Sequence, residues 1–270
     1  GFCVTAAQFE ELARGGRWQV VINSNFHDGS LSLAECHIEG ESDETFLLYA
    51  HTCHPSLAND NLSGISIAAH LAKWLLSQPR RDSYRVVFAP ATIGAISWLA
   101  QQDTAQLRQI KTGLVLSLLG DSADLSFKQA EQENCYTNRL VPLVLSSQGI
   151  AHRTIPFALF GYDERQFASP GIQLPVGRLS RSEFGEFPEY HTSDDDLHFV
   201  TPEHLEQSFR VCQSIIEANE GNTYPLSVRP MGEPNLARHD LYRAFGERDD
   251  RGQLQKAMMW ILNQANGRRD

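Results

Sequence analysis

The feature that most constrains the fold is an alternation between apolar, β-rich runs and amphipathic helical patterns. Phe46–Ala50 is continuously apolar, as strands buried on both faces of a sheet tend to be. Ser63–Leu76, a little further along, repeats its apolar residues with a helical period, and Ser63 can cap that helix. Strands that alternate with helices in this way predict an α/β sheet covered by helices on both faces.

Further runs continue the pattern along the chain. The expected strands are Trp18–Asn23, Leu31–Glu39, Phe46–His51, Tyr84–Ala89, Gly113–Leu119 and Thr154–Leu159. Leu31–Glu39 alternates in polarity, which suits a half-exposed strand, and Asp28-Gly29 before it predicts a hairpin. Another helix is expected from Thr201-Pro202 to about Ala218, because a capping hydroxyl followed by proline favours a helix start.

The chain divides at a stretch of irregular composition. Asn222–Pro234 contains three prolines and little periodicity, which indicates a boundary. We therefore expect a main domain over residues 1–225, and a linker with the start of a second module over residues 226–270. The sequence opens Gly1-Phe2-Cys3 without a methionine and closes on a polar stretch, so we expect a fragment of a longer protein.

Composition narrows the function classes. A net charge of −10 over 270 residues gives nucleic-acid binding no general electrostatic help, so we expect no nucleic-acid partner. The sequence has neither an apolar run long enough to span a membrane nor a signal segment, so no membrane partner is expected. Five cysteines at irregular spacing form no disulfide framework, which favours the cytoplasm. A homo-oligomer is left open.

The strongest local motif is Ala50-His-Thr-Cys-His-Pro-Ser-Leu-Ala-Asn-Asp-Asn-Leu-Ser-Gly64, between an expected strand and an expected helix. Ligands of open α/β sheets bind beyond the carboxyl ends of the strands. His54 and Asp60 offer the nitrogen and oxygen donors that zinc accepts. The alternative is a polar loop that only caps the helix. Cys53 is a weaker ligand candidate, because alternation along the strand end turns it toward the core.

Acidic and histidine-bearing loops follow elsewhere in the chain. His191 lies in the acid-rich segment Gly185–Leu197, where a carboxylate could fix its tautomer, although a solvated acidic loop would look the same. Asp163 and Glu164 follow the expected strand Thr154–Leu159. Either acid could be a metal ligand, a general base or a partner of a ligand, and a salt bridge to a basic residue is the alternative.

A further carboxylate, Asp121, follows the expected strand Gly113–Leu119, where a turn aspartate is the alternative. Rival chemistries have weaker support. The sequence has no GxSxG elbow, no P-loop and no GxGxxG after a strand. Thiol catalysis by Cys53 with His51 or His54 is disfavoured, because residues so close in sequence near a strand end seldom reach the required geometry.

Several stretches resemble the zinc aminopeptidase superfamily, which also includes the glutaminyl cyclases. They are His51-Thr-Cys-His-Pro-Ser-Leu-Ala-Asn-Asp-Asn-Leu-Ser-Gly64, Pro90-Ala-Thr-Ile-Gly94, Gly161-Tyr-Asp-Glu-Arg-Gln-Phe167 and Glu189-Tyr-His-Thr-Ser193. The likeness is greatest to an aminopeptidase-like branch that is often found beside polysaccharide-biosynthesis genes. It extends over residues 1 to about 225 and implies a three-layer α/β/α sandwich around a mixed central sheet.

The resemblance also implies roles for individual residues. His54 takes the first zinc-histidine position, Asp60 the bridging-aspartate position and His191 the last-histidine position. Asp121 matches a further carboxylate ligand, and Asp163 matches an aspartate that hydrogen-bonds within the site. A C-terminal winged-helix module commonly follows in this branch, and its beginning is expected in Gly232-Glu-Pro-Asn-Leu236 and the helix pattern Leu254–Leu262.

One departure from the superfamily pattern changes the expected chemistry. Ala91 stands where a Glu-Glu pair is typical, and no acid lies between Asp82 and Asp103. The usual His-x-Asp is His51-Thr-Cys53, or is displaced to His54. We therefore expect one zinc per chain, with Glu164 or Asp163 as a substitute base.

The expected activity is zinc-dependent hydrolysis of a peptide or small amide, of the aminopeptidase type. The absence of the Glu-Glu pair keeps two alternatives open. One is a catalytically impaired zinc-binding scaffold domain, and the other is acyl transfer of the glutaminyl-cyclase kind.

Overall fold

A computed structural model describes residues 4–223, 225–229, 231–232, 234–239, 241 and 251–267. The chain forms an N-terminal unit, Gly1–Leu31, and a main unit, Ser32–Asp270, which we describe separately. In the N-terminal unit, α1 (Ala6–Ala13) begins at a capping box: the Thr5 hydroxyl accepts a hydrogen bond from the Gln8 backbone, and the Gln8 side chain binds the Thr5 backbone.

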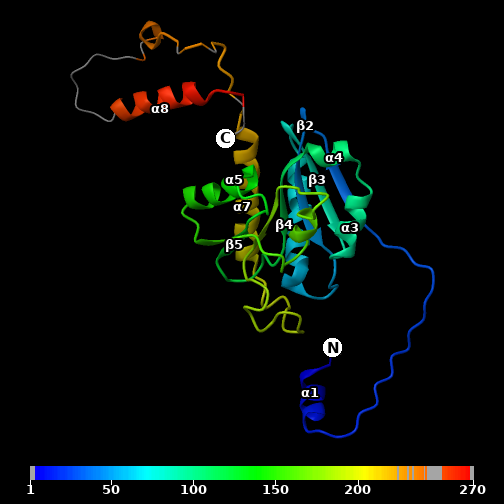
Figure 1. Cartoon of the computed structure of the whole chain (residues 1–270). Helices are drawn as coiled ribbons and strands as arrows, with labels where there is room; N and C mark the ends of the chain where they lie inside the picture. Colours follow the sequence, from blue (N-terminus) through cyan, green and yellow to red (C-terminus); the bar gives the residue numbers. More distant parts are fainter. Residues whose placement is uncertain are drawn as a thin grey trace. The chain divides into compact units, whose positions relative to one another are not determined.

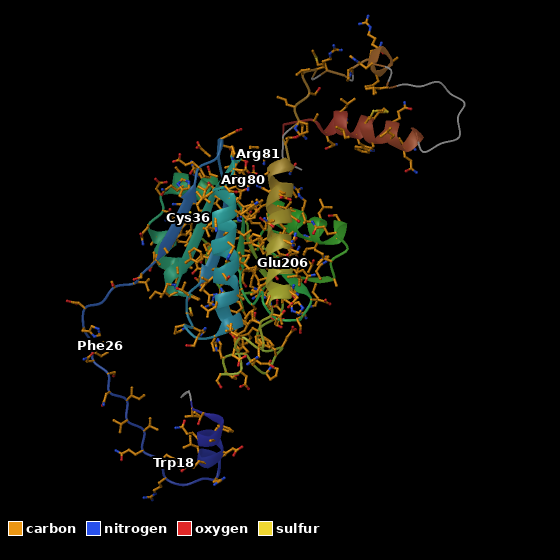
Figure 2. The ribbon with its side chains drawn as sticks, turned by 180° about the vertical axis from the view of Figure 1, so that it is seen from behind. Trp18, Phe26, Cys36, Arg80, Arg81 and Glu206 are labelled. Atoms are coloured by element: carbon orange, nitrogen blue, oxygen red, sulfur yellow. The ribbon has the colours of Figure 1, made fainter. Side chains whose placement is uncertain are left out.

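The expected strand Trp18–Asn23 and its hairpin are wrong, because residues 15–33 have no regular secondary structure. Val20, Val21 and Ile22 are exposed here, as are the labelled side chains of Trp18 and Phe26 in Figure 2. A strand needs a neighbour for its backbone hydrogen bonds, and none is paired with this segment in the described structure.

The described part of the main unit is built on a seven-stranded sheet with the order β1-β3-β2-β4-β7-β5-β6 (Figure 1). Its strands are β1 (Ala34–Ile38), β2 (Ser42–His51), β3 (Asp82–Ala89), β4 (Ile110–Leu116), β5 (Leu125–Lys128), β6 (His152–Ile155) and β7 (Val176–Ser180). β3, β2, β4 and β7 run parallel, while β1 and β5 pair antiparallel with β3 and β7. The sheet is therefore mixed, as expected.

Helices cover both faces of this sheet. One face carries α2 (Gly64–Leu75), α5 (Tyr136–Ser147) and α7 (Pro202–Gly221), and the other carries α3 (Ile93–Ala100), α4 (Thr104–Gln109) and α6 (Glu164–Phe167). The expected three-layer α/β/α arrangement is confirmed. No described helix is both long and apolar enough to span a bilayer.

β2 is an inner strand of the sheet, paired with β3 on one side and β4 on the other, which explains its continuous apolar run. Phe46, Leu48 and Ala50 pack into the apolar cluster on one face, and Leu47 and Tyr49 pack into the cluster on the other. Full burial of each large apolar side chain contributes about 1.5–3 kcal/mol, so β2 is held firmly from both sides. This places the end of β2 rigidly.

The C-terminal region contains a 3-10 turn (Leu236–His239) and α8 (Arg251–Gln264). An isolated bridge joins Leu226 to Asn266. The helix expected at Leu254–Leu262 is present within α8. Glu233, in the expected Gly232–Leu236 stretch, lies outside the described residues.

Candidate metal centre

A buried aspartate, Asp60, lies where β2 leads into α2. β2 ends at His51, and the segment Ala58–Ser63 forms a largely buried turn, kinked at Asp60 and Asn61, before α2 begins at Gly64. Because β2, β3 and β4 run parallel, this connection lies at the carboxyl edge of the sheet, where α/β proteins place their ligands.

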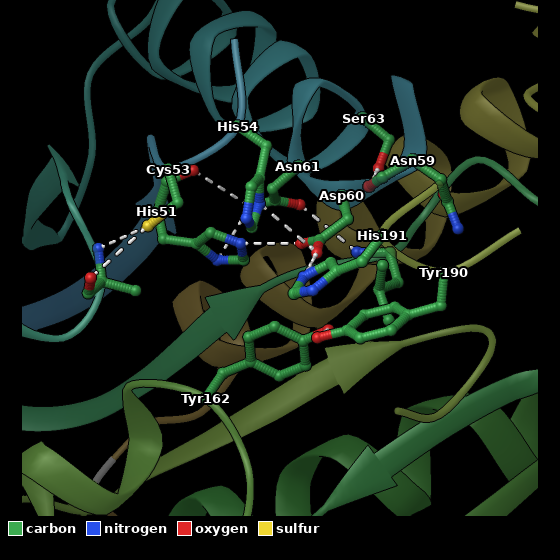
Figure 3. A network of polar contacts seen from close by, with 12 residues as sticks. His51, Cys53, His54, Asn59, Asp60, Asn61, Ser63, Tyr162, Tyr190 and His191 are labelled. Atoms are coloured by element: carbon green, nitrogen blue, oxygen red, sulfur yellow. Dashed lines mark hydrogen bonds and ion pairs between the residues drawn. The ribbon is translucent and has the colours of Figure 1, made fainter. Parts of the chain in front are cut away.

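Histidine nitrogens surround the Asp60 carboxylate (Figure 3). His51 Nε2 is 2.8 Å from Oδ1, and His191 Nε2 is 3.0 Å from Oδ2. His54 Nδ1 is 3.6 Å from Oδ2. Asp60 and His51 are buried, whereas the side chains of His54 and His191 are 36% and 47% exposed. The structure thus brings the predicted residues His54, Asp60 and His191 together, and it adds His51.

The charge states of these residues suit metal binding. Burial by itself would raise the pKa of Asp60, but the hydrogen bond and charge of His51, with smaller effects of His54 and His191, lower it below its usual value. Burial lowers the pKa of His54, which favours a neutral imidazole. A carboxylate and a neutral imidazole are the forms that bind metal ions.

His54 supplies the observation that tests whether these residues fit a metal. Its Nδ1 atom is buried and makes no hydrogen bond in the described structure, and such an atom needs a partner. One ligand atom from each of His51, His54 and Asp60 lies within 4.8 Å of the other two. Nitrogen and oxygen donors of this kind are those that zinc accepts, so the residues present fit a zinc ion.

The backbone around Asp60 is fixed by a second aspartate. Asp195 Oδ1 accepts the backbone N–H of Asn59 at 2.6 Å, and its Oδ2 accepts the backbone N–H of Asp60 at 2.9 Å. Two hydrogen bonds from successive backbone N–H groups to one carboxyl group fix the path of this turn. Asp195 therefore positions the candidate ligand without contacting its carboxylate.

Asp121, the further carboxylate predicted as a ligand, lies behind this turn. Its Oδ2 accepts a hydrogen bond from Asn59 Nδ2 at 2.7 Å, and its Oδ1 accepts one from Ser182 Oγ at 2.9 Å. It is not among the residues that the described structure groups around Asp60. Its geometry is that of a residue that positions Asn59.

A cavity of about 450 Å³ opens beside Asp60, His51, His54 and His191, which we call the Asp60 cluster. Besides the histidines and Asp60, it is lined by Cys53, Ala91, Thr92, Phe160, Gly161, Tyr162, Phe184 and Tyr190. Tyr162 stacks on His51 with ring centroids 5.1 Å apart, and Tyr190 stacks on His191 at 3.9 Å. The rings of His51 and His191 are thus each held by an aromatic neighbour, as Figure 3 shows.

Glu164, one of the two predicted bases, forms buried ion pairs with Lys128 and Arg178. It is fully buried, and its Oε1 lies 2.7 Å from Lys128 Nζ and 3.6 Å from Arg178 Nη1. The same oxygen accepts the backbone N–H of Tyr162 at 3.3 Å. Glu164 does not line the cavity, so its ion pairs, rather than proton transfer, account for its position.

Asp163, the other predicted base, is also fully buried and does not line the cavity. Burial raises the pKa of its carboxyl to about 7, while the nearby charge of His51 and the hydroxyl of Tyr49 oppose that rise. A carboxyl with such a pKa is half ionised near neutral pH. Unlike Glu164, it has no ion pair in the described structure.

Ala91, which was expected where the superfamily pattern has an acidic residue, contacts Cys53. Cys53 Sγ accepts the backbone N–H of Ala91 at 2.9 Å, and both residues line the cavity. Cys53 therefore does not turn into the core as predicted, because this contact holds it at the cavity wall. Burial raises the pKa of its thiol, with the Ala91 N–H opposing, so it is a poor nucleophile.

Several residues of the site escaped sequence reasoning. His51 could have been found, because it is the last residue of an unmistakable buried strand. Tyr162 flanks the predicted Asp163, but nothing in the sequence shows that its ring reaches His51. Asp195 stands between two other aspartates, and only the fold distinguishes it from them.

Family models match nearly the whole chain. A model described as "Domain of unknown function (DUF4910)" matches residues 8–222, and a winged helix-turn-helix model matches residues 223–270. The chain belongs to the DUF4910 family. The second match confirms the expected winged-helix module after the DUF4910 domain.

Relatives in Clostridium acetobutylicum share both parts. A candidate polysaccharide biosynthesis protein with an aminopeptidase-like domain is 40% identical over 268 residues, which are 99% of this chain and 61% of that protein. The crystal structure of a candidate peptidase from this organism matches with a TM-score of 0.80 at 38% identity, over 99% of this chain and 60% of that one. This DUF4910 chain thus spans about three fifths of these relatives.

More distant structures share the fold of the DUF4910 domain. A zinc aminopeptidase from Bacillus subtilis matches with a TM-score of 0.60 at 18% identity, over 69% of this chain and 49% of that one. A glutaminyl cyclase from Porphyromonas gingivalis matches with a TM-score of 0.57 at 14% identity, over 70% and 77% of the chains. The expected superfamily fold is confirmed by these likenesses.

Proposed function

We propose that this protein hydrolyses an amide or peptide bond with one zinc ion per chain, bound at Asp60. The observation that carries the proposal is the convergence of His51, His54 and His191 on one buried carboxylate at the floor of a cavity. A zinc ion bound there would polarise an amide carbonyl and lower the pKa of a bound water. The zinc aminopeptidase fold supports the same reading.

The protein's own residues divide the remaining work. Asp60 would supply the negative charge that balances the cation. The three imidazoles around Asp60 would bind the cation as neutral nitrogen donors. Asp195 fixes the Asp60 backbone, and the aromatic rings fix the imidazole planes. Because these contacts fix Asp60 and two of the imidazole rings, the ligand set is organised before a metal arrives.

Hydrolysis also needs a group that accepts a proton from water. Asp163 suits this role better than Glu164, because the raised pKa of its carboxyl lies near neutral pH and it has no ion pair. The charge of His51 acts on Asp163, so the two side chains lie within electrostatic range. Asp163 does not line the cavity, so the proton would reach its carboxylate by way of His51 and not directly from the water.

A second candidate function is zinc binding without efficient turnover. Ala91 favours it, because it removes a carboxylate from the cavity wall, and the described lining residues offer no carboxylate besides Asp60. The winged helix-turn-helix module would then serve recognition or assembly. The relative's description gives a polysaccharide biosynthesis setting for either function.

The test is hydrolysis of a panel of aminoacyl and acyl 4-nitroanilides by zinc-loaded protein. Wild type should release 4-nitroaniline, and Asp60→Asn should fall to background. Asp194→Asn, an exposed change in the loop of His191, is the matched control and should retain activity. Equal rates for wild type and Asp60→Asn would refute hydrolysis at this centre.

Two other outcomes identify the alternatives. Bound zinc without turnover of any amide would support the binding function. Cyclisation of a peptide with an N-terminal glutamine, lost in Asp60→Asn, would support acyl transfer of the glutaminyl-cyclase kind.

A further inference from the structure

The cavity beside the Asp60 cluster has exposed aromatic side chains at its rim. Phe160 packs edge-on against Phe184 with ring centroids 4.9 Å apart, and Phe184 packs against Tyr190 at 5.0 Å. Phe160 and Phe184 remain 68% and 46% exposed. Aromatic faces left open beside a ligand site are covered most favourably by another ring or an apolar group.

Three acids near this cavity are already engaged, and a fourth, Asp163, is buried and does not line it. Glu164 pairs with Lys128, and Glu183 pairs with Arg178 and accepts a hydrogen bond from Ser180 Oγ at 3.0 Å. Asp195 is turned toward backbone N–H groups.

Among the described lining residues, Asp60 is the sole carboxylate, and the histidines surround it. A cationic group that entered the cavity would therefore meet no free counter-charge on the described walls.

The formal charge of the loaded centre is positive. A divalent ion contributes +2 and Asp60 contributes −1, so the sum is +1 when the histidines bind as neutral rings. Arg178, whose guanidinium carbon is 5.2 Å from the Tyr162 ring centroid, adds no net charge, because it and Lys128 are balanced by Glu164 and Glu183. An α-amino group has a pKa of about 7.7–8.0 and is mostly protonated at pH 7. Like charges in a partly desolvated site repel each other strongly.

We propose that the cavity selects amides that carry an aromatic ring and lack an ammonium group next to the amide bond. The carbonyl oxygen then faces the positive centre, while the ring lies against Phe160, Phe184 and Tyr190. This proposal rests on the proposed amide-hydrolase function, whose reacting bond it describes. An amide whose acyl part carries no adjacent ammonium group meets this description. The first peptide bond of an unmodified peptide does not, because the free N-terminus lies next to it.

A pair of probes isolates the charge. Phenylalaninamide and 3-phenylpropanamide share the ring, the chain and the amide, and differ in the ammonium group alone. Calorimetric titration of the zinc-loaded chain at pH 7 should show 3-phenylpropanamide bound at least about tenfold more tightly. Equal or tighter binding of phenylalaninamide would overturn the proposal, as would failure of both amides to bind.

Variants test the ring contact. Phe184→Ala should weaken binding of 3-phenylpropanamide at least about fivefold. Leu143→Ala, which removes a similarly exposed apolar side chain on α5, should leave binding unchanged. No effect of Phe184→Ala would remove the aromatic part of the proposal.

Turnover of the matching 4-nitroanilides distinguishes failure of the proposed selectivity from failure of the proposed hydrolase activity. Selective binding without hydrolysis would leave this selectivity intact and refute the hydrolase. Hydrolysis that favours phenylalanine 4-nitroanilide over 3-phenylpropanoyl 4-nitroanilide would support the hydrolase and refute the selectivity.

Discussion

Lys128 and Glu164 form a fully buried ion pair, 2.7 Å between Nζ and Oε1, directly beneath the loop that bears Phe160 and Tyr162. Lys128 also donates to the Phe160 carbonyl at 2.7 Å, and Glu164 accepts the Tyr162 N–H. A Cβ on Gly161 would collide with both charged groups, so only glycine fits between them. The pair thus shapes one wall of the cavity.

Glu164→Gln should destabilise the protein by about 3–5 kcal/mol, because it leaves Lys128 and Arg178 buried with less compensating charge. Denaturant unfolding measures the change. The control is Glu206→Gln, which breaks the exposed Glu206–Arg210 pair on α7 (Figure 2) and should cost at most about 0.5 kcal/mol. Similar losses for both variants would show that the buried pair has no special weight.

Elemental analysis should find about one zinc per chain in the wild type and almost none in Asp60→Ala, since every histidine of the cluster is arranged around that carboxylate. His54→Ala should reduce zinc affinity further than an exposed histidine such as His70→Ala, because Nδ1 of His54 is buried without another partner. Full zinc content in Asp60→Ala would place the metal elsewhere.

Asp195→Ala should weaken zinc binding about 10–100-fold, as loss of groups that orient metal ligands does. The reason is that Asp195 holds the backbone N–H groups of Asn59 and Asp60. Competition with a fluorescent chelator gives the affinity. The neighbouring exposed residue offers a control, since Asp194→Ala should change little. Equal effects of the two variants would indicate that loop charge, rather than Asp195 itself, matters.

The pKa of Asp163 predicts a pH dependence of stability in zinc-free protein. Burial raises its pKa from 3.8 to about 7, so the folded state favours the protonated form. Between these values the native protein binds more protons than the unfolded chain, and stability falls as pH rises, by a total on the order of 4 kcal/mol. Asp163→Asn should remove this loss, so its advantage over wild type should grow from pH 4 to pH 7. Parallel stability curves would contradict the assignment.

Ala91→Glu should raise amide turnover by tenfold or more, because it returns a carboxylate to a cavity wall that otherwise has none besides Asp60 in its described lining. Ala91→Gln has nearly the same shape without the charge and should remain at the wild-type rate. A gain in both variants would point to packing against Cys53, and a gain in neither would show that the absent acid does not limit the rate.

The central strands could be predicted from sequence because their burial leaves an uninterrupted apolar run, as at Phe46–Ala50. β7 could not, because Arg178 interrupts Val176–Ser180 and would ordinarily argue for exposure. Its charge is buried only because Glu164 and Glu183 meet it from other segments. Lys128 hides β5 in the same way. Conversely, the apolar residues Val20–Ile22 have strand propensity but no paired neighbour.

The residues of the candidate site also differ in whether the sequence could predict their roles. His54, Asp60 and His191 could be selected because ligand-type residues follow strands or lie in loops before helices. The engagement of Glu164 and Asp121 could not be foreseen, because their partners, Lys128 and Ser182, are distant in sequence. Sequence thus identifies residue types that can do chemistry, while tertiary contacts decide which of them remain free.

The hydrogen bonds from Asp195 close a connection across 135 residues, and His191 reaches Asp60 across 131. Contacts of such sequence separation form late in folding, because the chain between them must first be ordered. A nascent chain that ends before this segment would carry the first histidines yet lack the clamp on Asp60. Zinc uptake during synthesis would therefore have to wait for the segment that contains His191 and Asp195.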